Sequence, residues 1–364
     1  MKIIRSTKCT LKFATAEKRR KLQHVLEEYG RVVNSYIDLF WDKEKCPENR
    51  ELLKGLLAQV EDTWLSFSSK QTAAREAISI IKAGRERDGE KAVKPTHNGR
   101  SMRVASTIAN LRKAKTADSF DAWLHLSCMG RKIILDLPIR FHKHYHKWNK
   151  LGKRLNSYVI HLNRVQFCFE IETGPKLTPN RCVGVDTGVK VYASLSTGEQ
   201  LGTDTEARIE RILRCKQGSK GQKRATRALK QRINEIAKEV TQRASLVVVE
   251  NLKGITRKTK VKRRLAKNMR RVIGKWNFRY WLDRLQQKCE ENRVSFRSVP
   301  SYNTSTICST CGHSDKRNRS RTEFLCLNCG HADNADINAA KNILIRFLTG
   351  PYGAGCKPLP GVVR

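Results

Sequence analysis

The stretch Cys182-Val-Gly-Val-Asp-Thr-Gly-Val-Lys-Val-Tyr-Ala-Ser-Leu195 carries the strongest fold signal in the chain. It predicts a strand, a tight turn at Thr187-Gly188 and a second strand, and the turn at Ser196-Thr-Gly-Glu199 leads to a third. A long basic helix follows, with apolar residues at helical spacings from Ile209 to Val240. Leu246-Val-Val-Val-Glu250 is apolar up to its last residue, which is typical of a buried strand.

The sequence after this strand continues to alternate between helices and strands. A helix with Phe278, Leu282, Leu285 and Cys289 on one face precedes a strand from Val294 to Val299. Asp336 then opens a last helix. Three antiparallel strands, a helix, and then alternating strands and helices predict an RNase H-like α/β sheet.

Three carboxylates occupy the ends of these predicted elements. Asp186 ends the first strand, Glu250 ends the fourth and Asp336 begins the last helix, and on an RNase H-like sheet these positions converge at one edge. Carboxylates suit Mg²⁺, and two such ions about 3.5–4 Å apart promote phosphodiester hydrolysis. Asp333 is an alternative third ligand. A lone strand-end Asp is usually a turn or cap residue, but a charge ending the apolar strand at Glu250 is costly without a partner.

Four of the twelve cysteines have metal-ligand spacing. Cys308 and Cys311 form one CxxC pair, and Cys326 and Cys329 form another after fourteen intervening residues. Two such knuckles complete a tetrahedral Zn²⁺ site with no open position, which predicts a structural zinc ion. His313 and His331 stay outside the ligand set, and a redox dithiol pair is disfavoured because the surrounding strand–helix unit is missing.

The other eight cysteines are scattered singly, and each is predicted to be a reduced core thiol. They are Cys9, Cys46, Cys128, Cys168, Cys182, Cys215, Cys289 and Cys356.

The first half of the chain has a different pattern. Residues 2–13 alternate as a half-buried strand with a basic outer face, and residues 16–125 have a helical pattern interrupted by a basic loop at 84–100. Strands return near Ile133–Leu137 and in a hairpin over 158–171. This order predicts a small β unit with an inserted helical domain, and Pro175–Pro179 marks a linker to the second half.

The net charge points to a polyanionic partner. The chain of 364 residues has 73 Lys and Arg against 34 Asp and Glu, a net charge of +39. Residues 206–275 alone hold 23 Lys and Arg against five Glu. Such charge disfavours a metabolic enzyme and favours nucleic-acid binding, with Lys258–Arg271 as one basic block. Trp276, Tyr280 and Trp281 follow that block and are more typical of a helix core than of base stacking.

These motifs together resemble the TnpB family of transposon-encoded, RNA-guided DNA nucleases, which are relatives of the compact type V CRISPR effectors. The resemblance covers about residues 180–348, and Leu11-Lys-Phe-Ala-Thr-Ala-Glu-Lys18 departs from the family pattern by lacking its Pro and Gln. The motifs that carry it are Gly184-Val-Asp-Thr-Gly188, Val249-Glu-Asn-Leu-Lys-Gly254, Asn303-Thr-Ser-Thr-Ile-Cys-Ser-Thr-Cys-Gly312, Cys326-Leu-Asn-Cys-Gly330 and Asp336-Ile-Asn-Ala-Ala-Lys-Asn-Ile343.

The resemblance implies roles for the site residues. Asp186, Glu250 and Asp336 would form a RuvC catalytic triad that binds two Mg²⁺ ions, and Arg319 would assist cleavage. The four cysteines would hold one Zn²⁺ in a ribbon that binds target nucleic acid. The implied partners are a guide RNA and a double-stranded DNA target, with one protein chain per guide RNA.

The resemblance also implies a domain order. It gives a wedge strand at 1–15, a helical recognition lobe at 16–125, the remainder of a small wedge β-barrel at 126–178, RuvC nuclease parts at 179–302 and 333–349, a zinc ribbon at 303–332 and a tail at 350–364. No apolar run suits a membrane span or a signal peptide, so we expect a cytoplasmic, nucleoid-associated prokaryotic protein.

Three other functions remain open from the sequence. A compact type V CRISPR effector would share the same chemistry. A guide-RNA-dependent, non-cutting DNA-binding regulator would keep the carboxylates for structure, although the intact triad disfavours it. A transposase would join DNA strands as well as break them.

Overall fold

A computed structural model describes residues 1–114, 119–252 and 266–350. The chain divides into two compact units, Met1–Glu172 and Thr173–Arg364, each with its own core. The division falls just before the predicted linker at Pro175–Pro179. No helix in these three ranges is long and apolar enough to cross a membrane.

The first unit pairs two long helices, α1 (Ala16–Trp41) and α3 (Phe67–Asp88). Thr15 and Ser66 cap their N-termini by accepting hydrogen bonds from the backbone N–H groups of Lys18 and Ser69. Short helical segments follow each of them: α2 (Asn49–Glu51), η1 (Leu52–Leu56) and η2 (Gly89–Lys91). A further helix, α4 (Lys143–Leu151), packs against β1 (Lys2–Thr10) and β7 (Arg164–Glu172).

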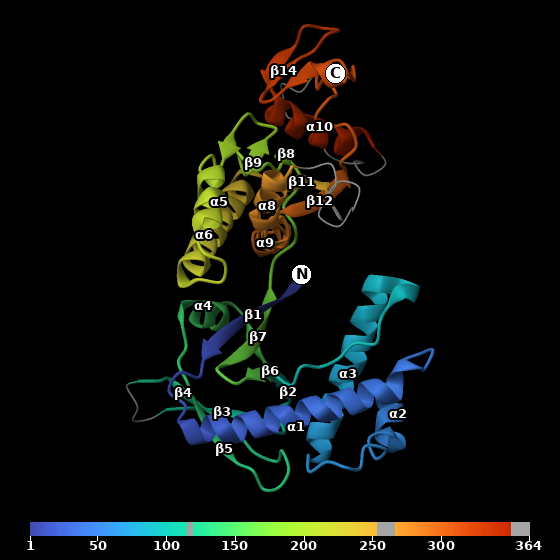
Figure 1. The fold of residues 1–364 in the computed structure, drawn as a ribbon, viewed down its shortest axis with the longest axis vertical. Coiled ribbons are helices and arrows are strands. Elements are labelled where there is room, and N and C mark those ends of the chain that lie inside the picture. The colour runs from blue at the N-terminus through green and yellow to red at the C-terminus, as the bar shows by residue number, and fades with distance from the viewer. Residues whose placement is uncertain (115–118, 253–265, 351–364) are drawn as a thin grey trace. The chain divides into compact units, whose positions relative to one another are not determined.

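Two antiparallel sheets complete the first unit (Figure 1). One has the order β1-β7-β6-β2, with β6 at Lys153–His161 and β2 at Ser101–Val104. The other has the order β3-β4-β5, at Ala109–Lys113, Ala122–Leu126 and Leu135–Ile139. In β1 every second residue is buried, as its sequence predicts.

Two expectations for this unit need correction. The predicted helical pattern over 16–125 ends near residue 91, and residues 101–126 contain three strands. Burial alternates with the period of a strand in β2 and β4. The strands in the described part of the chain also do not close a barrel. They form two sheets that meet at an isolated bridge between Thr10 and Arg140.

The second unit has the predicted mixed sheet, in the order β10-β9-β8-β11-β12. The antiparallel part is β8 (Cys182–Asp186), β9 (Ala193–Leu195) and β10 (Gln200–Leu201). The parallel part is β8, β11 (Leu246–Asn251) and β12 (Ser295–Pro300). Since β8 and β11 run parallel, their carboxyl ends, with Asp186 and Glu250, share one edge of the sheet.

Helices cover both faces of this sheet, and alternate strand residues contact opposite layers (Figure 1). Val183, Val185, Val247 and Val249 join a core with α5 (Thr205–Arg214), α6 (Lys220–Arg243), α8 (Lys267–Lys275) and α9 (Phe278–Glu291). Cys182, Leu246 and Val248 instead pack with α10 (Ala335–Thr349). The long basic helix predicted from Ile209 to Val240 is two helices, because Gly218 has a φ of +77° and Ser219 caps a new helix.

A small ribbon lies between β12 and α10 in the sequence. It contains η3 (Lys316–Asn318) and the strands β13 (Arg319–Ser320), β14 (Glu323–Leu325) and β15 (Ala332–Asn334). Gly312 and Gly330 have φ values of +77° and +71°, and each donates its backbone N–H to the carbonyl of the first cysteine of its pair. Both CxxC pairs therefore form the same tight turn.

Candidate functional site

Close packing of α10 on β8 sets the geometry of the candidate site. A Cβ atom built on Gly184 would lie 2.1 Å from the carbonyl oxygen of Ala340, so only glycine allows this approach. Asn334 caps α10 by accepting hydrogen bonds from the backbone N–H groups of Asp336 and Ile337. The first turn of α10, with Asp336, is thereby fixed next to the carboxyl end of β8.

Asp186 has a strongly shifted pKa at this edge. The pKa of its carboxyl is raised from 3.8 to about 7, first by burial and then by the negative charges of Glu250 and Asp336. The Arg319 guanidinium and the backbone N–H of Thr187 oppose this rise in pKa. The fold therefore brings together three carboxylates and one arginine that are up to 150 residues apart in the sequence.

Glu250 ends the buried part of β11, opposite Val299 of β12. Burial raises the pKa of its carboxyl. The hydroxyl of Thr304 donates to Glu250 Oε1 and, together with the positive charge of Arg346, lowers the pKa. Thr304 lies in the quoted motif Asn303–Gly312, but the motif does not indicate that its hydroxyl contacts Glu250.

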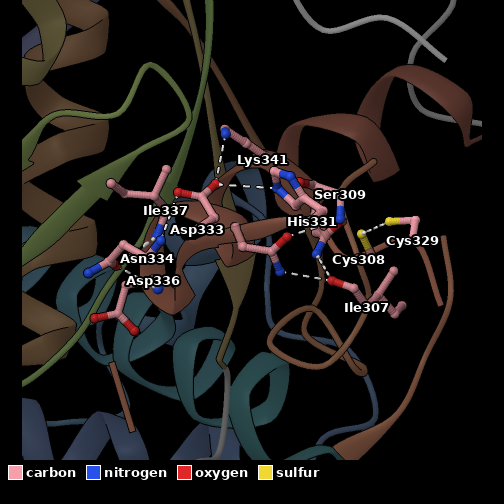
Figure 2. Close-up of polar contacts among 12 residues, drawn as sticks. Ile307, Cys308, Ser309, Cys329, His331, Asp333, Asn334, Asp336, Ile337 and Lys341 are labelled. Atoms are coloured by element: carbon pink, nitrogen blue, oxygen red, sulfur yellow. Dashed lines mark hydrogen bonds and ion pairs between the residues drawn. The ribbon is translucent and has the colours of Figure 1, made fainter. Parts of the chain in front are cut away.

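Asp333 and Asp336 have different partners. Asp333 Oδ2 lies 2.8 Å from Lys341 Nζ and 3.8 Å from His331 Nε2, and Figure 2 shows its carboxylate directed toward these two side chains. Arg319 Nη2 donates to Asp336 Oδ1 over 2.7 Å. Of the two aspartates, Asp336 is the one whose charge raises the pKa of Asp186.

The polar side of α10 holds the segment that leads into the ribbon. Asn338 is fully buried; its Oδ1 accepts from the backbone N–H of Ser309 and its Nδ2 donates to the carbonyl of Ile307. Asn342 donates to the carbonyls of Thr304 and Ile307. These bonds keep Thr304 beside Glu250 and join the ribbon to the carboxylate edge.

The four cysteines form a compact cluster, as predicted. The Sγ atoms of Cys308 and Cys329 lie 3.7 Å apart, and those of Cys311 and Cys326 lie 3.6 Å apart. Tetrahedral zinc with Zn–S bonds of about 2.3 Å needs sulfurs about 3.8 Å apart, so one such ion fits. Across residues 1–114, 119–252 and 266–350 this is the only group of three or more Cys, His, Asp or Glu ligand atoms within 4.8 Å of one another.

The three carboxylates are spaced more widely than the thiolates. All three lie in the described part of the chain, yet they do not form a group with every ligand oxygen within 4.8 Å. At least two of the three carboxylates therefore have ligand oxygens more than 4.8 Å apart.

The three aromatic residues after the basic block belong to the core, as expected. Trp281 is fully buried and Trp276 is 5% exposed. Tyr280 donates its hydroxyl to Asn234 Oδ1, and Lys230 Nζ lies over its ring. The two tryptophan rings are therefore not available for base stacking, and Tyr280 is half-buried against the same core.

The basic residues of α5 and α6 divide into paired and unpaired groups. Arg208, Arg214 and Arg232 form ion pairs with acidic residues, which the sequence pattern did not indicate. Lys223, Arg224 and Arg227 are exposed and have no ion-pair partner among the residues that the structure describes. The predicted block Lys258–Arg271 lies mostly outside the described residues; Arg270 and Arg271 are in α8.

The scattered cysteines meet the core prediction only in part. Cys9, Cys182 and Cys289 are buried, and burial raises the pKa of Cys9 and Cys289 to about 12. Cys46, Cys168 and Cys215 are half-buried, and Cys356 lies outside the described residues. For Cys128 the prediction is wrong: it is exposed, because it lies in a loop with a φ of +56°.

The second unit thus combines half-buried carboxylates at the edge of a mixed α/β sheet with a four-cysteine ribbon ahead of its last helix. Residues 278–343, from the start of α9 into α10, match the family model of the Cas12f1-like TNB domain. The match confirms, for this part of the chain, the predicted resemblance to compact type V effectors. No curated protein matches the chain.

Several solved structures align over most of the chain at low identity. The matching protein chain in the structure of the Cas12f1–sgRNA–target DNA complex is 16% identical in sequence to this chain. The alignment covers 94% of this chain and 99% of that chain, with a TM-score of 0.35. CasPhi-2 (Cas12j) bound to crRNA and phosphorothioate-DNA is 12% identical, with coverages of 95% and 91% and a TM-score of 0.47. The AacC2c1–sgRNA binary complex is 8% identical, with coverages of 89% and 70% and a TM-score of 0.39. TM-scores below 0.5 do not establish a shared fold.

Proposed function

We propose that this chain is an RNA-guided DNA endonuclease. Asp186, Glu250 and Asp336 are the proposed catalytic residues for hydrolysis of the phosphodiester bond. The observation that carries the proposal is the convergence of these three carboxylates, with the pKa of Asp186 raised to about 7. Buried like charges repel one another, and a bound cation removes that repulsion. The TNB-domain match over 278–343 supports the same family of activity.

In this proposal the carboxylates hold two Mg²⁺ ions, for which hard oxygen ligands are suited. The ions would supply Lewis acidity and an activated water for in-line attack on the phosphodiester. Asp186 and Glu250 are fixed by the parallel strands, and Asp336 by the first turn of α10. Arg319, which is 2.7 Å from Asp336, is placed to neutralise charge near the scissile phosphate.

The guide RNA and the DNA target are the proposed partners. The unpaired cations of α6 and the net charge of +39 support binding to a polyanion. In RNA-guided enzymes base pairing reads the target, so the protein needs mainly backbone contacts. We propose one protein chain per guide RNA, the predicted order of RuvC parts and zinc ribbon over 179–349, and Zn²⁺ in the four-cysteine cluster.

The test uses the full chain purified with its bound RNA. The RNA is sequenced, and duplex DNA matching the guide is incubated with the complex and Mg²⁺. We expect broken, unjoined DNA strands from the unmodified chain and none from Asp186→Ala or Glu250→Gln. Glu199→Gln, an exposed change in a turn, serves as the control and should cut normally.

Three outcomes would contradict the proposal. Full cutting by Asp186→Ala would remove the triad assignment. Persistent binding of matched duplex without cleavage would favour the regulator, and joined products would favour a transposase. The sequence of the bound RNA separates a transposon-end guide from a CRISPR-repeat guide.

A further inference from the structure

The turn that follows Asp186 is held by two buried tryptophans. Trp281 Nε1 donates to Thr187 Oγ1 over 3.2 Å, and Trp276 Nε1 donates to the carbonyl of Gly188 over 2.9 Å. The two indoles come from α9 and from the residue that ends α8. Both indole N–H groups thus bind the same two-residue turn, 88 to 94 residues away in the sequence.

A third aromatic residue contacts both tryptophans. Tyr192 is fully buried and donates its hydroxyl to the backbone carbonyl of Trp276 over 2.9 Å. Its ring centroid lies 5.3 Å from that of Trp281, with an interplanar angle of 82°. Edge-to-face packing of this kind fixes ring orientation, so the indole N–H groups have little freedom to turn away.

Thr187 connects this arrangement to the carboxylate. It directly follows Asp186 in the chain, and its side-chain oxygen accepts from Trp281. Gly188, the next residue, is held through its carbonyl by Trp276. The two indoles therefore hold the backbone immediately after Asp186, from which the Asp186 carboxylate extends.

We propose that Thr187, Trp276 and Trp281 are positioning residues that orient Asp186 for metal binding. This inference rests on the proposed function of Asp186. Partners of this kind behind a metal ligand fix its orientation, and their loss typically lowers metal affinity or activity by about 10- to 100-fold. We call Thr187, Tyr192, Trp276 and Trp281 the Asp186 brace.

The test compares Thr187→Val with Thr187→Ser in the full guide-bound complex. Valine keeps the shape of threonine without the oxygen, and serine keeps the oxygen. Two measurements are made: Mn²⁺ binding by electron paramagnetic resonance without DNA, and the Mn²⁺ concentration for half-maximal cleavage. The ions bound by an Asp186→Ala complex give the background from RNA.

Thr187→Val should raise both Mn²⁺ concentrations by about 10-fold or more, and Thr187→Ser by less than about twofold. Tyr192→Phe, which removes only the hydroxyl that holds Trp276, should shift them in the same direction. Thr72→Val is the control, since Thr72 is a buried helical threonine of the first unit that donates to the carbonyl of Ser69. It should leave both values unchanged, and thermal unfolding of each variant reports any general loss of stability.

Normal Mn²⁺ binding and cleavage by Thr187→Val, with an inactive Asp186→Ala, would contradict the positioning role of the Asp186 brace. The proposed function of the chain would be unaffected by that result. An equal shift in Thr187→Ser would also contradict the positioning role, because the oxygen would then be irrelevant. Full activity of Asp186→Ala would overturn the proposed function and the brace with it.

Discussion

Asp186 is an acid whose ionised form is disfavoured by the fold. Its pKa is about 7 in the folded chain against 3.8 for an ordinary aspartate. Because the folded pKa is the higher one, the stabilising contribution is present below about pH 4 and is lost as the pH rises through about 7. A difference of about 3 pKa units corresponds to about 4 kcal/mol.

We therefore expect Asp186→Asn to stabilise the protein at pH 8 by up to about 4 kcal/mol when no divalent cation is added. The gain should shrink toward pH 4, where the aspartate is already protonated. Urea unfolding of both proteins at pH 4, 6 and 8 measures this. Asp315→Asn is a control of opposite sign, because Arg317 lowers the pKa of Asp315 to about 2. Equal stability of Asp186→Asn and the unmodified chain at pH 8 would contradict the prediction.

Gly184 gives a second prediction at the scale of one residue. In Gly184→Ala the new methyl group would meet the Ala340 carbonyl, so α10 must move away from β8. We expect a loss of about 1–3 kcal/mol in the free energy of unfolding and loss of DNA cleavage as Asp336 moves away from Asp186. Urea unfolding and the cleavage assay measure the two effects.

Gly84→Ala is the matched control for this change. Gly84 lies in α3, and nothing lies within 4 Å of the position of its added Cβ. That variant should fold and cut normally, with a slight gain in helix stability. Normal cleavage by Gly184→Ala would show that the close approach of α10 is not needed.

The sequence alone identified the residues whose type and spacing are unusual. Glu250 closing an apolar strand and the paired CxxC motifs are signals of that kind. The contacts of Thr187, Thr304 and Asn338 were not predicted, although all three residues lie in the quoted motifs, because each acts through one or two hydrogen bonds that exist only after distant segments meet. No local pattern reports such a contact.

At the scale of elements, the sheet was predictable and some connections were not. β8 and β11 have clear apolar runs, so these two strands could be predicted directly from the sequence. The break between α5 and α6 depends on the positive φ of Gly218. The sequence did not indicate this break, because the apolar periodicity continues on both sides of it. The short strands of 101–126 were missed because the preceding helices suggested a longer helical domain.

The ribbon gives a prediction about removal of its zinc ion. Its buried apolar cluster is small and consists of Cys308, Cys326, Phe324 and Ala335, so it depends on the metal for stability. We expect a chelator to release about one Zn²⁺ per chain, to unfold the ribbon and to abolish cleavage as Arg319 leaves Asp336. Metal analysis and hydrogen exchange over 303–334 measure these changes.

The control for this experiment is Cys46→Ser, which removes a cysteine outside the ribbon. It should retain zinc, whereas Cys311→Ser should not. A ribbon that keeps its exchange protection after zinc release would contradict a structural role for the ion.

At the scale of the whole molecule, the basic residues behind the net charge of +39 differ in whether they have acidic partners. Lys223, Arg224 and Arg227 have no acidic partner among the described residues, whereas Arg208, Arg214 and Arg232 are paired. Cations that are already paired release fewer counterions on binding a phosphate backbone. The unpaired group should therefore contribute more to RNA affinity.

We expect the triple change of Lys223, Arg224 and Arg227 to Gln to weaken RNA binding and to reduce its salt dependence. The slope of log affinity against log salt should fall by about 2–3, close to one per lost contact. A titration of bound RNA from 50 to 300 mM salt measures the slope. Arg214→Gln should change it little, and an equal effect of that paired residue would contradict the prediction.

The order of the elements along the chain also has a consequence for synthesis. β8 and β11 leave the ribosome long before α10, and Asp336 is separated from Glu250 by the ribbon. A nascent chain that ends before residue 336 therefore holds two of the three carboxylates and lacks the helix that packs on Gly184. Under the proposed function such a chain would not cut DNA. Cleavage would begin only after α10 has been synthesised and has packed on β8, so the order of synthesis would keep the incomplete chain inactive.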